Sequence, residues 1–241
     1  MPESDLILEA RQSNRILAAL PRASSERLQS VMEPVDMPTR MSLYDIGQPI
    51  EHVYFLYRGV ASIMTPMKEG IAVELATVGS EGMIGIPVFL GAKTTSSKAF
   101  MQVPGEGVRM TSYAFLDFLE GCPELGRLLS RYTLALMTQM AQNAACNRTH
   151  SIEERCARWL LMTRDRVGED TFPLTQEFLA QMLGVRRPSV SIAAGILAKA
   201  GLISYVRGQI TILDRAALER SCCECYGIIR SEFERLVGGD G

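Results

Sequence analysis

The chain has 241 residues, of which 47% are apolar and 22% are charged, and its formal net charge is −2. This composition excludes a disordered or fibrous chain. The chain is long enough for two folded domains. Because the net charge is close to zero, a nucleic-acid partner would have to be met by a local basic patch.

The sequence shows no signal peptide and no membrane-spanning segment. No segment approaches the roughly 18 uninterrupted apolar residues that a membrane span needs, and the N-terminal residues MPESDLILEARQSNR carry acids where a signal peptide would be basic. We therefore expect a cytoplasmic protein without a membrane partner. The six cysteines are unevenly spaced and do not resemble a disulfide framework, so we expect them to be reduced.

In the first half of the chain, the pattern of apolar residues changes from one typical of helices to one typical of strands. Apolar residues at helical spacing in 5–33 predict two short helices, broken by Pro21 and ended before Pro34. Residues 43–115 then contain short apolar runs separated by glycine, namely HVYFLY, VASIM, IAVELATV, MIGIPVFL, AFMQV and VRM. At least six strands this close together predict an antiparallel sandwich or barrel.

Residues 124–149 predict one long helix, which at about 1.5 Å per residue would span nearly 40 Å. Its apolar residues lie on more than one side, which favours a partner helix over the alternative of a long core helix in a monomer. Ser151 and Glu154 then form a capping box that predicts a new helix from Ile152.

Residues 174–203 have the spacing of a helix-turn-helix. Thr175 is a plausible N-cap, and Ala180, Gly184 and Val190 take the places of the small crossing residue, the turn glycine and the buried apolar residue. The first backbone N–H groups of a helix have no internal partner, so proline is favoured in the first turn. Pro188 is therefore expected to begin the second helix.

Two arginines stand at the start of that second helix. Arg186 and Arg187 would lie at the end that enters the DNA major groove, where arginine can contact guanine or a phosphate; the alternative is a solvated helix end. The following residues ISYVRGQITIL predict a β-hairpin with Arg207 at its tip. Such a hairpin would make the domain a winged helix, whose wing contacts the DNA backbone.

Taken together, these segments resemble the Crp/Fnr family of bacterial transcription regulators over the whole chain. The residues that carry the resemblance are NRILAALP (14–21), LYDIGQPIEHVYFLYRGVASI (43–63), HSIEERCARWLL (150–161) and the helix-turn-helix with its wing. The resemblance implies an α+β fold: an antiparallel, jelly-roll-like β-roll sensor domain at 1–121, a long dimerisation helix at 122–149 and a winged helix-turn-helix at 150–241. It also implies a homodimer, a roughly palindromic double-stranded DNA operator and contact with RNA polymerase.

The resemblance carries over to the DNA-reading residues in part. Thr175 matches a phosphate-contacting threonine and Arg187 a guanine-reading arginine, whereas Pro188 and Ile192 replace two base readers of the cyclic-AMP-responsive members. The operator should therefore differ from theirs. We expect DNA contacts from Thr175, Gln176, Arg186, Arg187, Ser189, Ser191 and Arg207.

The sensor departs further from the cyclic-nucleotide binders of this family. Those proteins carry Gly-Glu-Leu, whose glutamate holds the ribose, and an Arg-Ser or Arg-Thr pair that holds the cyclic phosphate. The corresponding residues here are Gly85-Ile86-Pro87 and Ser97-Lys98. We therefore expect a small-molecule effector other than cyclic AMP, with Gly85, Ser97 and Lys98 as its candidate contacts.

Metal and cofactor sites are not expected. The iron–sulfur members carry an N-terminal cysteine cluster, and this chain has no cysteine before Cys122. Cys222, Cys223 and Cys225 fall in an expected helix, which would point Cys222 and Cys225 one way and Cys223 another. This geometry leaves two soft ligands, so packing or an incidental reactive thiol is favoured over a metal site. Haem would need an axial ligand from His52, His150, a cysteine or Pro2, and His52 is favoured as an ordinary surface residue.

Three other interpretations remain at this stage. The sensor could be a ligand-free scaffold, the C-terminal cysteines could make the regulator redox- or metal-responsive, or the β-roll could serve an enzyme or signalling complex. No catalytic signature such as HExxH, a P-loop or GxSxG occurs, so we do not expect an enzyme.

Overall fold

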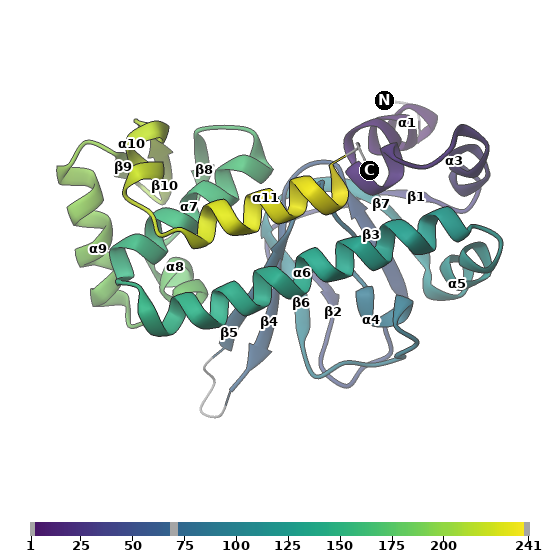
Figure 1. Ribbon diagram of the computed structural model, residues 1–241, viewed down its shortest axis with the longest axis horizontal. Coiled ribbons are helices and arrows are strands. Elements are labelled where there is room, and N and C mark those ends of the chain that lie inside the picture. Colours follow the sequence, from purple (N-terminus) through teal and green to yellow (C-terminus); the bar gives the residue numbers. More distant parts are fainter. Residues whose placement is uncertain (1–2, 68–71, 239–241) are drawn as a thin grey trace.

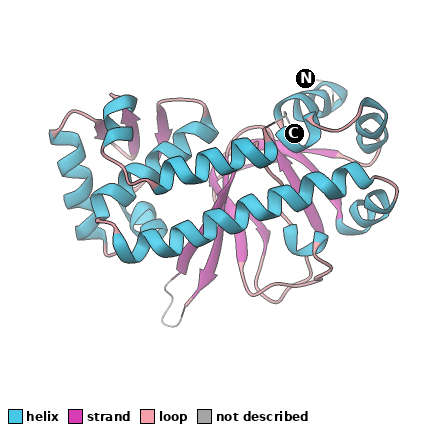
Figure 2. Cartoon of the chain, viewed as in Figure 1, coloured by secondary structure: helices cyan, strands magenta, loops and turns pink. Residues whose placement is uncertain are grey.

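A computed structural model describes residues 3–67 and 72–238. A β-roll with flanking helices is followed by the long helix α6 and a second, mostly helical half (Figures 1 and 2). The elements of the first part are α1 (Glu3–Ser13), α2 (Arg15–Ala18), α3 (Arg22–Gln29), β1 (Glu33–Met37), β2 (Ser42–Tyr44), β3 (His52–Leu56), β4 (Val60–Pro66), β5 (Ala72–Val78), α4 (Ile86–Phe89), β6 (Lys98–Val103), β7 (Gly105–Thr111) and α5 (Ser112–Glu120). Those of the second part are α6 (Pro123–Thr149), α7 (Ile152–Val167), β8 (Thr171–Pro173), α8 (Gln176–Leu183), α9 (Arg187–Lys199), β9 (Ile203–Val206), β10 (Gln209–Ile212), α10 (Arg215–Arg220) and α11 (Cys225–Val237).

The β-roll consists of two antiparallel sheets, with strand orders β1-β7-β3 and β2-β6-β4-β5. The chain passes between the two sheets several times, and the last of these passages is at Pro104, between β6 and β7. Gly105 follows at once, and a Cβ there would overlap the Arg58 carbonyl oxygen, so only glycine fits. Buried side chains of both sheets belong to one core, and the expected antiparallel β fold is confirmed. Among the described helices none is long and apolar enough to cross a membrane.

One predicted strand is wrong. Residues 83–90, MIGIPVFL, form a single bridge between Ile84 and Tyr54 and then the short helix α4. Gly85 has a φ of 111°, which ends extended pairing, and Pro87 lies in the first turn of α4. The apolar run therefore reflects burial of Ile86 and Val88 and not a strand.

The two helices predicted at the N-terminus are in fact three. The first break lies at Asn14, and Pro21 precedes α3 as its N-cap. Asn14 is fully buried: its Oδ1 accepts from the backbone N–H groups of Ile16 and Leu17, and its Nδ2 donates to the carbonyls of Leu56 and Gly82, both at 2.9 Å. One asparagine thus starts α2 and fastens it to the β-roll.

Replacing Asn14 with alanine is expected to lower the free energy of unfolding by about 2–4 kcal/mol, because α2 loses its cap and two buried carbonyl groups lose their donor. Urea unfolding followed by circular dichroism measures this. The control is Asn147→Ala, an exposed asparagine of α6, which should change the free energy by less than about 0.5 kcal/mol. Equal effects of the two substitutions would contradict the role given to Asn14.

Helix α6 is confirmed as a single long helix. One side of it is buried, against α11 and the β-roll. Its buried side chains include Leu125, Leu129, Tyr132, Gln139 and Asn143. Helix α11 runs alongside α6 (Figure 1), with Phe233 beside the Tyr132 ring at 6.2 Å between centroids. The sequence predicted that a partner helix packs on this long helix, and α11 of the same chain covers part of the predicted surface. Leu134 and Met137 remain 48% and 61% exposed on the other side of α6.

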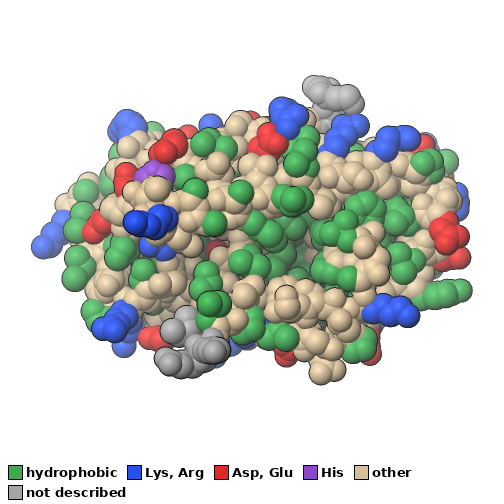
Figure 3. All heavy atoms as spheres, turned by 60° about the horizontal axis from the view of Figure 1, so that its bottom comes forward, with side chains coloured by type: hydrophobic (Ala, Val, Ile, Leu, Met, Phe, Trp, Pro, Cys, Tyr) green, Lys and Arg blue, Asp and Glu red, His purple; other side chains and the backbone are tan. Residues whose placement is uncertain are grey.

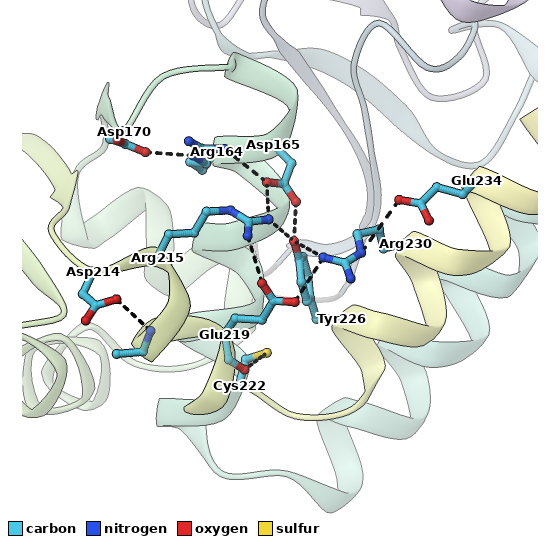
Figure 4. Close-up of polar contacts among 11 residues, drawn as sticks. Arg164, Asp165, Asp170, Asp214, Arg215, Glu219, Cys222, Tyr226, Arg230 and Glu234 are labelled. Carbon is cyan, nitrogen blue, oxygen red and sulfur yellow. Dashed lines mark hydrogen bonds and ion pairs between the residues drawn. The ribbon is translucent and has the colours of Figure 1, made fainter. Parts of the chain in front are cut away.

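The helix expected across Cys222, Cys223 and Cys225 is interrupted. Helix α10 ends at Arg220, α11 begins at Cys225, and Cys222 to Glu224 lie in the turn between them. In that turn Cys222 points back toward α10, where its thiol donates to the Glu219 carbonyl at 3.1 Å (Figure 4). The prediction that Cys222 and Cys225 face one way is therefore wrong.

Candidate nucleic-acid interface

The helix-turn-helix forms from α8 and α9. Thr175 is the N-cap of α8, and its hydroxyl accepts from the Phe178 N–H at 3.1 Å. Gly184 ends α8 in the left-handed region, with a φ of 64°, which turns the chain toward α9. Ala180 and Val190 are buried, as their places in the motif require.

The start of α9 is exposed. Arg186 is its N-cap, Arg187 is its first residue, and Pro188 lies in the first turn, so the proline begins the helix as predicted. All three residues are exposed, and so is Ser191, whereas Ser189 is half-buried. No ion pair is recorded to either arginine among the residues described, so both guanidinium groups can meet an anion. The helix start therefore presents exposed guanidinium groups, which are donors of the type that can bind in a DNA groove.

One hydrogen bond joins the two helices at this surface. The Ser191 hydroxyl donates to Gln176 Oε1 at 2.7 Å. Gln176, which follows the N-cap of α8, is therefore brought beside the exposed face of α9. The structure thus places Thr175, Gln176, Arg186, Arg187 and Ser191 on the same motif, as the sequence predicted.

The predicted wing is present and has a third strand. Strands β9 and β10 form a hairpin, and β8 pairs with β10 on its other edge. The turn residues Arg207 and Gly208 have φ values of 50° and 76°, as a two-residue hairpin turn with the twist of its strands requires. Arg207 is exposed at the tip, where a phosphate contact is open to it. Tyr205 anchors the wing through its hydroxyl, which donates to the Leu174 carbonyl at 2.7 Å.

The helix-turn-helix also packs on the β-roll. Phe178 of α8 meets Phe100 of β6 edge to face, with 6.1 Å between ring centroids. Met182 lies 3.7 Å from the hydroxyl of Ser62 in β4. Between β5 and the recognition helix there is a groove of about 700 Å³ whose lining includes Ala72, Arg186 and Arg187. Helix α8 is therefore in direct contact with the β-roll.

A buried polar network links the β-roll to α7. Glu74 of β5 is 7% exposed; its Oε1 accepts from the Trp159 indole at 2.9 Å, and its Oε2 lies 2.9 Å from the Ser62 hydroxyl. The Ser62 hydroxyl also lies 2.6 Å from Gln102 Oε1. Burial raises the pKa of Glu74 to about 7, more than the hydrogen bonds from Ser62 and Trp159 lower it.

Protonation of Glu74 resolves a conflict in this network. The Ser62 hydroxyl has one hydrogen and two acceptors beside it. If Glu74 carries the proton, its carboxyl group donates to Ser62, and Ser62 donates to Gln102. No local sequence pattern signals this network, because its members come from β4, β5, β6 and α7.

The candidate effector residues lie in separate places. Gly85 lies against Val53 of the β1-β7-β3 sheet, whereas Ser97 and Lys98 lead into β6 of the other sheet. Lys98 Nζ is 5.9 Å from the centroid of the Phe100 ring and borders a cleft of about 350 Å³ between the β-roll and α8. No hydrogen bond recorded for the described residues joins Gly85 to Ser97 or Lys98.

Three cysteines and a histidine lie close together at the end of α6. His150 lies next to Cys225, with 3.7 Å between its Nδ1 and the Cys225 Sγ, and Cys146 lies 3.5 Å from Cys223 between sulfur atoms. The sequence analysis did not predict that Cys146 and His150 lie beside Cys223 and Cys225. Their spacing of one helical turn, beside a Cys-x-Cys pair, is the signal that could have found them.

A β-roll joined by a long helix to a winged helix with an exposed, basic recognition helix defines the class of two-domain DNA-binding transcription regulators. Residues 154–221 match the Crp-like helix-turn-helix domain family. The chain is similar to the CRP-like cAMP-activated global transcriptional regulator of Mycobacterium tuberculosis, with 26% identity over 198 residues, 78% of this chain and 88% of the relative. Residues 154–221 are therefore a Crp-like helix-turn-helix domain, and the chain as a whole resembles transcription regulators of the Crp/Fnr family.

Solved structures share the fold. FixK2 from Bradyrhizobium japonicum has a TM-score of 0.69 at 16% identity, covering 80% of this chain and 98% of FixK2. The c-di-GMP responsive global regulator CLP of Xanthomonas campestris has a TM-score of 0.65 at 15% identity, covering 80% of this chain and all of CLP (100%). A CRP-family regulator from Thermus thermophilus has a TM-score of 0.65 at 21% identity, covering 78% of this chain and 95% of the regulator.

Proposed function

We propose that this regulator acts as a homodimer on a roughly palindromic double-stranded DNA operator, with the N-terminal ends of two α9 helices in successive major grooves. The observation that carries the proposal is the exposed start of α9, where Arg186 and Arg187 have no ion pair among the described residues. Gln176, Ser189 and Ser191 supply neutral donors and acceptors beside them, and Thr175 and Arg207 reach the phosphates. RNA polymerase is the proposed further partner at the promoter, in the cytoplasm.

The division of labour follows the three segments of the chain. Residues 1–121 sense, 122–149 dimerise and 150–241 bind DNA. The packing of Phe178 and Met182 against the β-roll supports communication from sensor to reader.

The proposed effector is a small molecule other than cyclic AMP. Ile86 stands where the cyclic-nucleotide binders of this family place their ribose-holding glutamate, and its side chain is 6% exposed, inside the apolar core. Lys98 faces the cleft beside α8, which supports an anionic ligand. The relative from Mycobacterium tuberculosis is named as cAMP-activated, so cyclic AMP is the first ligand to test against this proposal.

Selection of bound sequences from a random duplex library tests the DNA proposal. The expected result is a sequence with two-fold symmetry and half-sites about one DNA turn apart. Selected sequences without that symmetry, or no preference over random duplex, would refute it. Repeating the binding assay with and without cyclic AMP tests the effector, and a cyclic-AMP-dependent gain in affinity would refute that part alone.

Replacing Arg187 with alanine is expected to cost about 1–3 kcal/mol of operator binding and to relax the choice at one base pair of each half-site. Thr175→Ala is the matched contrast, because a lost phosphate contact should weaken all sequences about equally. Fluorescence anisotropy with the selected operator and a scrambled duplex separates the two effects. An Arg187→Ala protein that loses as much affinity for the scrambled duplex would show a phosphate contact instead.

A further inference from the structure

Four metal-ligating side chains converge where α6 ends and α11 begins. Cys146, His150, Cys223 and Cys225 bring one ligand atom each, and these atoms all lie within 4.8 Å of one another. Cys146 and His150 are one helical turn apart, Cys223 lies in the turn after α10, and Cys225 is the first residue of α11. The three cysteines are buried and His150 is half-buried, so most of the cluster is shielded from bulk water.

Two distances among these four atoms match the edges of a tetrahedral zinc site. With Zn–S near 2.3 Å and Zn–N near 2.0–2.1 Å, the edges of a tetrahedral site are about 3.5–3.8 Å long. The Cys146 and Cys223 sulfur atoms are 3.5 Å apart, and Cys225 Sγ is 3.7 Å from His150 Nδ1. An ion at the centre requires only small movements of side chains that are already gathered.

A carboxylate orients the histidine. Glu224 Oε2 lies 3.1 Å from His150 Nε2, so Nε2 carries the hydrogen and Nδ1 is left to face Cys225. Metal-bound histidines commonly donate their second ring N–H to a carboxylate, which fixes the ring and its tautomer. Thr149 Oγ1, at 3.3 Å from Nδ1, already donates to the Ala145 carbonyl and does not require that nitrogen.

Two buried arginines provide the charge that such a complex needs. Arg155 and Arg158 of α7 are 6% and 4% exposed, and neither forms an ion pair within the described ranges. Each leaves its Nε without a hydrogen-bond partner. Burial lowers the pKa of Arg155, and a negative charge on the Cys146 sulfur opposes that shift. Three thiolates, a neutral imidazole and Zn²⁺ together carry a charge of −1, which offsets buried cations.

We propose that Cys146, His150, Cys223 and Cys225 bind one Zn²⁺ ion per chain in a closed tetrahedral site. Binding replaces the three thiol protons, which pass to solvent, and involves no oxidation or reduction. Thiolate-rich tetrahedral sites with four protein ligands are typical of structural zinc. The ion would hold α11 against the end of α6 at His150, directly before α7 begins at Ile152. It would thereby fix the hinge between the long helix and the DNA-binding half.

Metal analysis of the full-length protein, purified without chelator from zinc-supplemented cells, tests the site. About one zinc per chain is expected for the wild type and for Cys222→Ser, and less than about one tenth for Cys223→Ser and Cys225→Ser. Cys222→Ser is the matched control, because this neighbouring thiol already donates to the Glu219 carbonyl. Equal zinc loss in Cys222→Ser and Cys225→Ser would overturn the assigned ligand set.

A cobalt titration keeps the test independent of whether the variants fold. Reduced, zinc-free wild-type protein should take up one Co²⁺ per chain, with the sulfur-to-cobalt charge-transfer bands and strong visible absorption of a tetrahedral thiolate site, and Zn²⁺ should abolish both. Failure to bind either ion overturns the proposal. A Cys146–Cys223 disulfide in metal-free protein prepared with reductant would also overturn it, in favour of a redox site.

The melting temperature supplies a second readout. At free Zn²⁺ about one hundred times Kd, the wild type should melt roughly 5–10 °C higher than the chelated protein, because the ion binds only the folded chain. Mg²⁺ should have no such effect, and Zn²⁺ should not raise the melting temperature of Cys225→Ser. An equal rise in Cys225→Ser would place the zinc effect elsewhere. None of these measurements depends on DNA binding.

Discussion

Replacing both Leu134 and Met137 of α6 with glutamate is expected to convert the proposed dimer to a monomer and to lower operator affinity about 10²–10⁴-fold. In a symmetric dimer the second half-site is bound intramolecularly, at a high effective concentration. A monomer reads one half-site and loses that gain.

The structure of α6 explains the choice of these residues. Leu134 and Met137 are 48% and 61% exposed, although they lie on the longest helix, and Ala141 continues the same exposed stripe. The spacing of three and then four residues is that of a helix-pairing seam, on the side of α6 turned away from the β-roll. The space-filling view in Figure 3 shows apolar side chains across the middle of one face of the molecule, with most charged groups around its rim.

Sedimentation velocity gives the oligomeric state, and anisotropy gives the affinity for the full operator and for one half-site. The control is Leu90→Glu, an exposed leucine (65%) after α4 that the proposed dimer does not use. Because all three side chains are exposed in the single chain, circular dichroism should be unchanged throughout. A double variant that stays dimeric would refute dimerisation through this face of α6.

The DNA-reading half could be predicted closely from the sequence because its signals are local. The Ser151 capping box, the Thr175 cap, Gly184 in the turn and Pro188 at a helix start each act within a few residues of chain. The hairpin turn at Arg207 is equally local. The third strand, β8, was not predicted, because three residues carry too weak a pattern.

What escaped prediction depends on contacts between distant segments. Asn14 breaks the first helix because carbonyls from residues 56 and 82 accept its amide hydrogens. The cysteine cluster joins positions 77 residues apart, and helical periodicity misled there because Cys222 and Cys223 lie in a turn. The candidate effector residues carry no such local signal, so their role rests on the resemblance and stays a prediction.

Replacing Glu74 with glutamine is expected to stabilise the protein at pH 8 by about 2.5 kcal/mol more than at pH 5. Burial raises the pKa of Glu74 from 4.5 to about 7 in the folded protein. Between those values the native state keeps a proton that the unfolded chain has released. Stability from this group is therefore fully present below about pH 4.5 and is lost as the pH rises through about 7.

Glutamine mimics the protonated carboxyl group without titrating. Its oxygen can accept from Trp159, and its amide can donate to Ser62, which then donates to Gln102. Urea unfolding at pH 5, 6, 7 and 8 gives the difference in free energy between wild type and variant. Glu169→Gln, at an exposed glutamate, is the control and should give a difference that does not change with pH. A flat difference for Glu74→Gln as well would contradict the buried proton.

Trp159 allows the same proton to be followed in the folded protein. It is the single tryptophan of the chain, and its indole donates to Glu74 at 2.9 Å. Its emission should change with a midpoint near pH 7 in the wild type and stay constant in Glu74→Gln, since ionisation alters the charge beside the indole. Because Trp159 lies on α7 and Glu74 on β5, the ionised carboxylate would also loosen the contact between the β-roll and the DNA-reading half. Operator affinity measured across the same pH range should then shift with that midpoint in the wild type and not in Glu74→Gln.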